Sequence, residues 1–182
     1  MKRFVSFLCS LLVAMAMSAQ SSEHLKFMGV PITGTIAQFQ TKLTQKGCTY
    51  NKSISASFPV GARAFKGTFA GNKVDIYVYY NTSTKVVYRV KAIISGNTEK
   101  MADQEYAEML SLFKQKYDTS DFDYDKYEGK ESVFIYLPNG RIDMYISKDA
   151  EMIRYPYIYN VHMDYWDGVN TNKNTDSKLD DI

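Results

Sequence analysis

The feature that most constrains the fold is the strict alternation of apolar and polar side chains in several short segments. In segment 73–79, aliphatic residues at even positions alternate with charged or tyrosine residues at odd positions. A period of two residues is typical of a strand with one face buried. Turn signals such as 59–61, 71–72 and 138–140 separate these segments. The segments expected to form strands are 49–58, 62–70, 73–80, 85–94, 132–137, 141–147 and 157–166.

Two further segments have helical periodicity instead. Segment 35–46 is expected to be a helix because Ile36, Phe39 and Leu43 recur on one face. Segment 98–117 has apolar residues at similar spacing and is expected to be the second helix. The sequence therefore predicts an α+β fold in which two helices cover one face of an antiparallel sheet.

The order helix, strands, helix, strands indicates a tandem repeat. Segment 73–78 matches segment 141–146 in character at every position, and the two helices match at nearly the same offset. The half-repeats would be 33–96 and 97–169. Chance similarity between short strands is the alternative, so the sequence leaves duplication open.

The N-terminal segment 1–19 has the three parts of a secretory signal peptide. Lys2 and Arg3 precede an apolar stretch, and small residues follow it at the expected cleavage region. Cleavage after Ser18 or after Ala19 both fit. The sequence therefore predicts a periplasmic or secreted protein.

Removal of the signal peptide also changes the charge of the chain. The formal charge of +2 falls to 0, because segment 1–19 holds two basic residues and no acidic one. A neutral chain offers no electrostatic argument for nucleic acid, and no later stretch is apolar enough for stable membrane insertion. Residues 20–169 are expected to form one domain, and 170–182 a flexible polar tail. Only Cys48 remains, so no intramolecular disulfide is expected.

Two resemblances accompany this layout. The helix-and-strand order resembles the tandem α-β repeat proteins of the β-lactamase-inhibitor-protein type. Segment 24–31, the helix-flanking residues Gly34-Thr35 and Lys46-Gly47, and segment 161–165 resemble a group of uncharacterised exported proteins of Gram-negative gut bacteria. The resemblance implies an exported location and carries over no catalytic residues.

Candidate catalytic and metal-binding residues are few. Cys48 could serve as a nucleophile with His162 as its base, but nothing near it in sequence would activate the thiol, and a buried core role fits it better. His24 and His162 lack zinc-ligand spacing. His162 shares one strand face with Asp164, which indicates a solvated polar face.

The acidic run at 121–125 resembles the start of a calcium loop. It lacks the turn glycine and the bidentate glutamate, because Lys126 and Ser132 occupy those positions. No phosphate-binding glycine loop occurs in the sequence either. No catalytic residue, metal site or cofactor is therefore predicted.

The alternation itself singles out a surface. If Val74, Ile76 and Val78 face the core, their odd-numbered neighbours face away, and the same parity applies to the later strands. The predicted binding residues are Asp75, Tyr77, Tyr79, Arg89, Lys91, Asp143 and Tyr145. Tyrosines among charges of both signs suit recognition, since tyrosine combines a large contact area with a hydroxyl group. The alternative is that tyrosine merely suits a half-exposed strand.

These observations favour an exported, non-catalytic binding module. Its partner would be a protein, a peptide or a glycan at the cell envelope. Two alternatives remain: an envelope hydrolase with an unrecognised site, and a structural subunit of a surface assembly.

Overall fold

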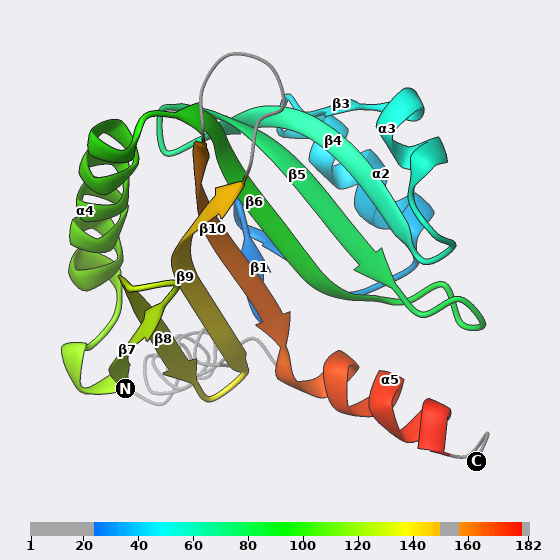
Figure 1. The fold of residues 1–182 in the computed structure, drawn as a ribbon. Helices are drawn as coiled ribbons and strands as arrows, with labels where there is room; N and C mark the ends of the chain where they lie inside the picture. Colours follow the sequence, from blue (N-terminus) through cyan, green and yellow to red (C-terminus); the bar gives the residue numbers. More distant parts are fainter. Residues whose placement is uncertain (1–23, 150–156, 180–182) are drawn as a thin grey trace, which may run out of the picture.

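The protein has an α+β fold with one large antiparallel sheet (Figure 1). The computed structural model describes residues 24–149 and 157–179. The predicted signal peptide lies outside the described residues. Within them are four α-helices, a sheet of eight strands and a separate pair of short strands.

The element boundaries follow the predicted segments closely in most places. The helices are α2 (Ile36–Gln45), α3 (Lys52–Ser57), α4 (Glu99–Lys116) and α5 (Gly168–Leu179), with a 3₁₀ turn η2 (Thr119–Asp121). The first strands are β1 (Lys26–Phe27), β2 (Val30–Pro31), β3 (Thr49–Tyr50), β4 (Ala62–Phe69), β5 (Asn72–Tyr80) and β6 (Val87–Asn97). The later strands are β7 (Phe122–Tyr127), β8 (Lys130–Leu137), β9 (Gly140–Asp149) and β10 (Ile158–Asp167).

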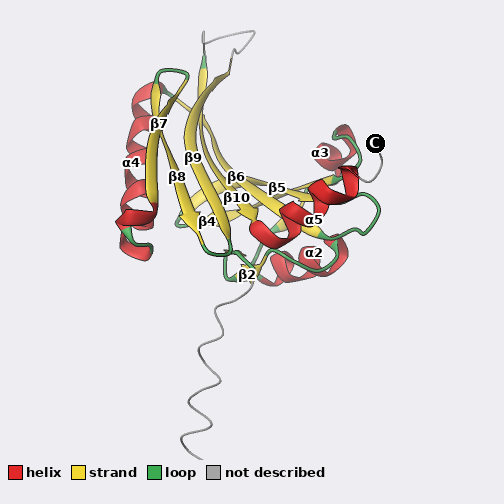
Figure 2. Cartoon of the chain, turned by 90° about the horizontal axis from the view of Figure 1, so that it is seen from below, coloured by secondary structure: helices red, strands yellow, loops and turns green. Residues whose placement is uncertain are grey.

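The strand order of the large sheet is symmetric about its centre. It runs β3-β4-β5-β6-β10-β9-β8-β7, so the strands that follow α2 form one side and those that follow α4 the other. The sides meet where β6 pairs with β10. Figure 2 shows that the sheet is curved, with α4 beside β7 and β8. Two helix-plus-strands units joined along their last strands would have this order, although duplication stays a prediction.

One continuous apolar core holds the sheet and helices together. Val74, Ile76 and Val78 of β5 are at most 4% exposed, as the alternation predicts. The same cluster contains Phe39 of α2 and Met109 of α4. Burial of this apolar surface is the main favourable term in folding.

The first helix begins as predicted. The Gln38 backbone N–H donates to Thr35 Oγ1 over 3.4 Å, and the Gln38 side chain accepts from the Thr35 backbone N–H over 2.9 Å. These two bonds form a capping box, which satisfies backbone groups that the helix itself leaves unpaired.

The predicted strand 49–58 is wrong beyond its first residues. Strand β3 ends at Tyr50, and helix α3 follows. Asn51 causes the change, because its side chain accepts a hydrogen bond from the Ile54 backbone N–H over 3.1 Å. The Ser55 hydroxyl also donates to the Asn51 carbonyl oxygen over 2.7 Å. Such local side-chain bonds favour a helix start over a continuing strand.

Most of the segment predicted to be a flexible polar tail, residues 170–179, belongs to helix α5 instead, and residues 180–182 lie outside the described residues. Asp167 starts the helix, since its carboxylate accepts the Asn170 backbone N–H over 2.9 Å. The Asn170 amide then donates to the carbonyl oxygens of Ile32 and Val87, each over 3.0 Å. The segment is polar and therefore looked solvated, but its amides are bound to backbone groups far away in sequence.

Truncation of a buried core side chain should cost far more stability than truncation of an exposed one. We expect Ile76→Ala to lower the free energy of unfolding by about 2–5 kcal/mol, because it leaves a cavity in a fully buried site. Tyr124→Ala should change it by less than about 1 kcal/mol, since that side chain is 46% exposed. Urea denaturation measures both values. Equal losses in the two variants would contradict this description of the core.

Asp167 should contribute more to stability than its position at the end of the last strand suggests. It is fully buried and also accepts the Leu25 backbone N–H over 2.8 Å. Asp167→Ala leaves this donor and that of Asn170 unpaired, so we expect a loss of about 2–5 kcal/mol. Asp176→Ala, an exposed change in the same helix, is the control. The role assigned to Asp167 is wrong if urea denaturation finds both variants equally stable.

Candidate functional site

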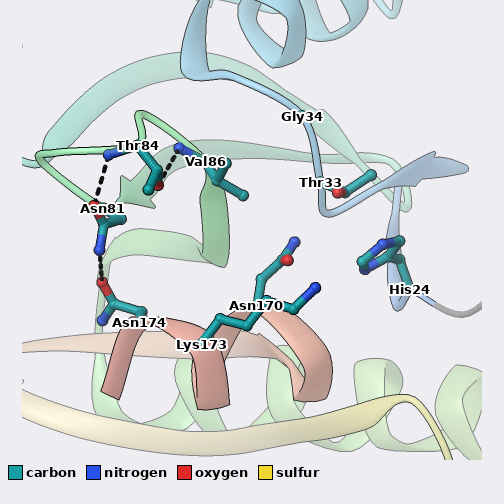
Figure 3. A pocket seen from close by; sticks show the side chains of 9 residues that line it. All are labelled: His24, Thr33, Gly34, Asn81, Thr84, Val86, Asn170, Lys173 and Asn174. Carbon is teal, nitrogen blue, oxygen red and sulfur yellow. Dashed lines mark hydrogen bonds between the residues drawn. The ribbon is translucent and has the colours of Figure 1, made fainter. Parts of the chain in front are cut away.

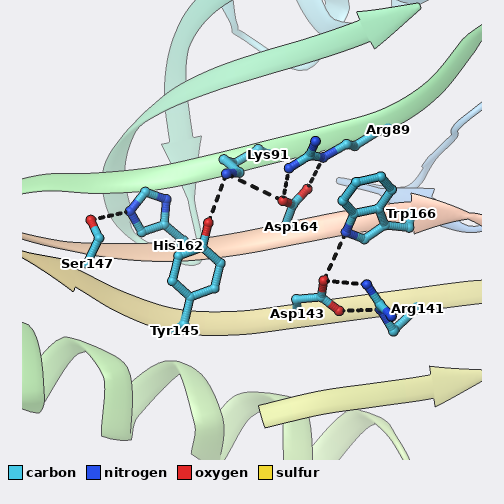
Figure 4. Close-up of polar contacts among 9 residues, drawn as sticks. All are labelled: Arg89, Lys91, Arg141, Asp143, Tyr145, Ser147, His162, Asp164 and Trp166. Carbon is cyan, nitrogen blue, oxygen red and sulfur yellow. Dashed lines mark hydrogen bonds and ion pairs between the residues drawn. The ribbon is translucent and has the colours of Figure 1, made fainter. Parts of the chain in front are cut away.

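The candidate site is the sheet face whose side chains lie outside the apolar core cluster. We call it the polar face, and it comprises Asp75, Tyr77, Tyr79, Arg89, Lys91, Asp143, Tyr145, His162, Asp164 and Trp166. The strand register arranges several of them in rows. One row runs Tyr77, Lys91, Asp164 and Asp143, and the next runs Tyr79, Arg89, Trp166 and Arg141. Figure 4 shows the side chains of β6, β9 and β10 in this arrangement.

Asp164 lies at the centre of the polar face. It is 2% exposed, and two guanidinium nitrogens of Arg89, Nε and Nη2, donate to its two carboxylate oxygens. Lys91 Nζ lies 3.5 Å from the same carboxylate. Removal of one partner of a buried ion pair leaves the other charge uncompensated, which costs about 3–5 kcal/mol. The three side chains are therefore held in fixed positions.

Lys91 connects this ion pair to an aromatic stack. Its ammonium group donates to the Tyr145 hydroxyl over 2.9 Å. Burial alone would lower the pKa of Lys91, but the Tyr145 hydrogen bond and the Asp164 charge outweigh it and raise the pKa. The Tyr145 ring in turn stacks on the His162 ring, with centroids 4.6 Å apart. The tyrosine is thus fixed at both its ring and its hydroxyl.

Cations and aromatic rings alternate along the second row. The Arg89 guanidinium lies 4.7 Å from the Tyr79 ring centroid and 3.8 Å from that of Trp166. On β9, the other neighbour of β10, the Arg141 guanidinium lies 5.9 Å from the Trp166 ring centroid. Each such contact contributes about 0.5–2 kcal/mol, depending on solvent exposure.

Asp143 holds Trp166 and Arg141 in place. The Trp166 indole N–H donates to its carboxylate over 3.0 Å, and Arg141 Nη2 donates to the same oxygen over 2.9 Å. Burial raises the pKa of the Asp143 carboxyl, and the Arg141 hydrogen bond and charge offset part of that increase. The two buried aspartates thus face three cations, Arg89, Lys91 and Arg141.

His162 was expected on a solvated face, and that expectation is wrong. The residue is 8% exposed, and its Nε2 lies 2.7 Å from the Ser147 hydroxyl. Its Nδ1 is buried without a hydrogen-bond partner among the described residues. Burial and the nearby Lys91 charge lower the pKa of His162 to about 3. The imidazole is therefore neutral at physiological pH.

Ser147 and His162 resemble part of a hydrolytic site only superficially. In a serine triad, a carboxylate accepts a hydrogen bond from the nitrogen that here has no partner. Cys48 belongs instead to the apolar core cluster, away from His162 and the polar face. Burial raises the pKa of its thiol, which disfavours the reactive thiolate.

Two cavities adjoin helix α5. One, of about 350 Å³, lies between α5 and the β5–β6 turn and is lined by His24, Asn81, Asn170 and Lys173 among others (Figure 3). The other, which we call the Trp166 pocket, has about 410 Å³ and lies at the end of the polar face. Its lining includes Tyr136, Arg141, Trp166, Thr171 and Asn172.

The structure brings some of the predicted binding residues together and leaves others apart. Four of them take part in the hydrogen bonds and ion pairs around Asp164 and Trp166, namely Arg89, Lys91, Asp143 and Tyr145. Tyr79 joins this network because its ring lies against the Arg89 guanidinium. Asp75 instead pairs with Lys66 over 3.2 Å, and the Tyr77 ring packs against Phe58 with centroids 5.1 Å apart.

Sequence reasoning did not identify Arg141, Ser147, Asp164 and Trp166 as site residues. Their only sequence signal was strand parity, and parity does not reveal that β10 lies between β6 and β9.

Comparisons with known proteins add no assignment. No family model matches the chain, and neither a curated protein nor a solved structure matches it. Among the described residues, no helix is long and apolar enough to span a membrane. No group of three or more His, Cys, Asp or Glu side chains suited to a metal ion occurs in residues 24–149 and 157–179.

The buried imidazole predicts a specific pH dependence of stability. The pKa of His162 is about 3 in the folded protein and 6.5 in the reference state, so the unfolded chain binds a proton first as the pH falls. Protonation of His162 in the unfolded chain therefore lowers the free energy of unfolding below about pH 6.5, by about 2 kcal/mol between pH 7 and pH 5.

His162→Gln should remove the contribution of His162 to the pH dependence of stability. We expect the difference in free energy of unfolding between wild type and variant to shift by about 2 kcal/mol between pH 7 and pH 5. Urea denaturation of both proteins at several pH values measures it, and the comparison isolates the substituted position. Parallel pH profiles would show that His162 titrates normally.

Proposed function

We propose that the chain is an exported, non-catalytic binding module that holds its partner on the polar face. The observation that carries the proposal is the set of aromatic rings fixed by buried ion pairs, above all Trp166 between Arg89 and Arg141. Its partner is a protein, a peptide or a glycan at the cell envelope. Periplasmic or secreted location is part of the proposal and rests on the signal-like segment 1–19.

The chemistry of the face supports binding. Tyrosine, tryptophan and arginine are the side chains most often found at energetic hot spots of interfaces. Here their conformations are already restricted by the network, so a partner would not have to immobilise them. Such preorganisation lowers the entropic cost of association.

The layout of the fold supports it as well. We infer that α2 and α4 cover one face of the sheet and leave the polar face for a partner, in two tandem helix-plus-strands units. This is the arrangement implied by the resemblance to β-lactamase-inhibitor-type repeats. The symmetric strand order is consistent with it.

The alternatives receive less support from the geometry. A hydrolase would need an accessible nucleophile, whereas Ser147 and His162 are each 8% exposed. A structural subunit that assembles through sheet edges would need an edge free to pair. The edge strand β7 instead carries Asp123, Asp125 and Lys126, and charges on an edge strand discourage further pairing.

Site-specific crosslinking tests the proposal. A photoreactive phenylalanine analogue at Tyr77 should give a discrete crosslinked adduct in the cells that produce the protein. The same analogue at Tyr124 is the control, because Tyr124 pairs with Val133 on the opposite parity. Tyr79→Ala should then weaken capture of the crosslinked partner about 5- to 30-fold, which corresponds to about 1–2 kcal/mol.

Two results would contradict the proposal. One is an adduct from Tyr124 and none from Tyr77. The other is unchanged partner affinity of a Tyr79→Ala protein whose melting temperature is also unchanged.

A further inference from the structure

The Trp166 pocket supplies more information about the ligand than the rest of the polar face does. We propose that this pocket binds an uncharged sugar ring, so that the ligand of the polar face is a glycan. The inference rests on the proposed function and narrows its partner class. The pocket volume of about 410 Å³ lies in the range of roughly 300–1,000 Å³ that is typical of small-molecule sites.

The pocket contains two aromatic rings at neighbouring positions. Arg141 of β9 pairs with Tyr136 of β8 on one side and with Trp166 of β10 on the other, so the two rings lie on either side of Arg141. Tyr136 is 51% exposed, so its ring is accessible to a ligand. A sugar ring presents C–H groups on its faces, and these pack on the electron-rich face of an aromatic ring. Tyr136 offers such a face, whereas the Arg89 guanidinium already covers one face of the Trp166 ring.

Groups that can bond to hydroxyls surround the rings. Arg141 directs Nε and Nη2 at Asp143, and its third nitrogen, Nη1, makes no hydrogen bond within the described residues. The Thr171 hydroxyl donates to the Tyr88 carbonyl oxygen over 3.3 Å, so its own oxygen can still accept. Asn172 adds an exposed amide with both donors and an acceptor.

The charges of the pocket favour an uncharged ligand. Arg141 is neutralised by Asp143, so it offers hydrogen bonds without a net positive charge. Asp167 is buried and directs its carboxylate at backbone N–H groups of Leu25 and Asn170. An anionic peptide or an acidic sugar would therefore find no unpaired cation here. The remaining polar groups match a ligand rich in hydroxyls.

The backbone is tightly packed at one border of the pocket. Gly140 passes so close to β10 that a Cβ atom there would lie 2.1 Å from the Trp166 carbonyl oxygen. The Gly168 N–H also donates to the Asn139 carbonyl oxygen over 3.0 Å, which ties helix α5 to the β8–β9 turn. The row of Trp166, Arg89 and Tyr79 continues from the pocket along the polar face, so a longer glycan would extend in that direction.

Intrinsic fluorescence tests the inference directly. Trp166 is the single tryptophan of the chain, so tryptophan emission reports on the surroundings of this one side chain. The titrants are six neutral tetrasaccharides, built from glucose in α or β linkage, mannose, galactose, xylose and N-acetylglucosamine. Tetragalacturonate is the acidic counterpart. We expect saturable changes with at least one neutral member, at micromolar to millimolar concentration, and weaker binding of the acidic one.

Variants locate the response. Tyr136→Ala should weaken saccharide binding at least about tenfold, since it removes the exposed ring of the pocket. Asn172→Ala should weaken it severalfold and is a second variant should the first fold poorly. Tyr124→Ala is the matched control, because it removes a tyrosine of similar exposure, 46% against 51%, from β7.

Three results would overturn the inference. The first is no emission change with any neutral saccharide up to about 50 mM, well above the millimolar dissociation constants of weak ligands. The second is a response that Tyr136→Ala and Asn172→Ala leave unchanged. The third is tighter binding of tetragalacturonate. If saccharides fail but the Tyr77 position crosslinks to a partner, the proposed function stands and the glycan inference falls.

Discussion

The buried carboxylate of Asp164 is the interaction on which the centre of the structure depends. It lies between Arg89 and Lys91 across the β6–β10 pair, where the two sides of the sheet meet. Asp164 is 2% exposed, and its buried carboxylate is tolerated only because it is paired with cations and hydrogen-bonded. The same carboxylate therefore both holds the sheet halves in register and positions the cations of the polar face.

The positions of the aromatic rings follow from those cations. Arg89 stacks on Trp166 and Tyr79, while Lys91 bonds to the Tyr145 hydroxyl, so each ring is placed by a group that Asp164 already holds. Partly buried networks of this kind have few alternative arrangements, because any displaced member leaves a buried polar group unsatisfied. The result is a surface that is polar in composition yet rigid in shape.

Local patterns in the sequence predicted much of this fold. Alternation located strands such as β5 and β9, and the capping box at Thr35 located the first helix. One error, the helix α3 within the predicted strand 49–58, arose from local hydrogen bonds at Asn51 that compete with the strand pattern. The other arose where distant contacts decide the outcome. Polar residues after Asp167 form α5 because Asn170 bonds to backbone groups of β2–α2 and β6, and a one-dimensional pattern contains no sign of such partners.

The site was less predictable for the same reason. Parity placed Arg89 and Lys91 on the polar face, but only the strand order brings Asp164 between them. The burial of His162 likewise depends on Tyr145, which stacks on it from the neighbouring strand. Parity shows which face a side chain occupies and contains no information about what covers it.

The central position of β10 has a consequence for the order of folding. It is the last strand in the sequence, yet it pairs with β6 on one side and β9 on the other. Across the β6–β10 pair, Arg89 and Asp164 are 75 residues apart in sequence. Contacts of such separation form late, because the intervening loop must close first. A chain that emerges from its N-terminus onward cannot join its two half-sheets until β10 has emerged. Cooperative folding of the whole sheet therefore waits for the last strand, in whichever compartment the protein folds.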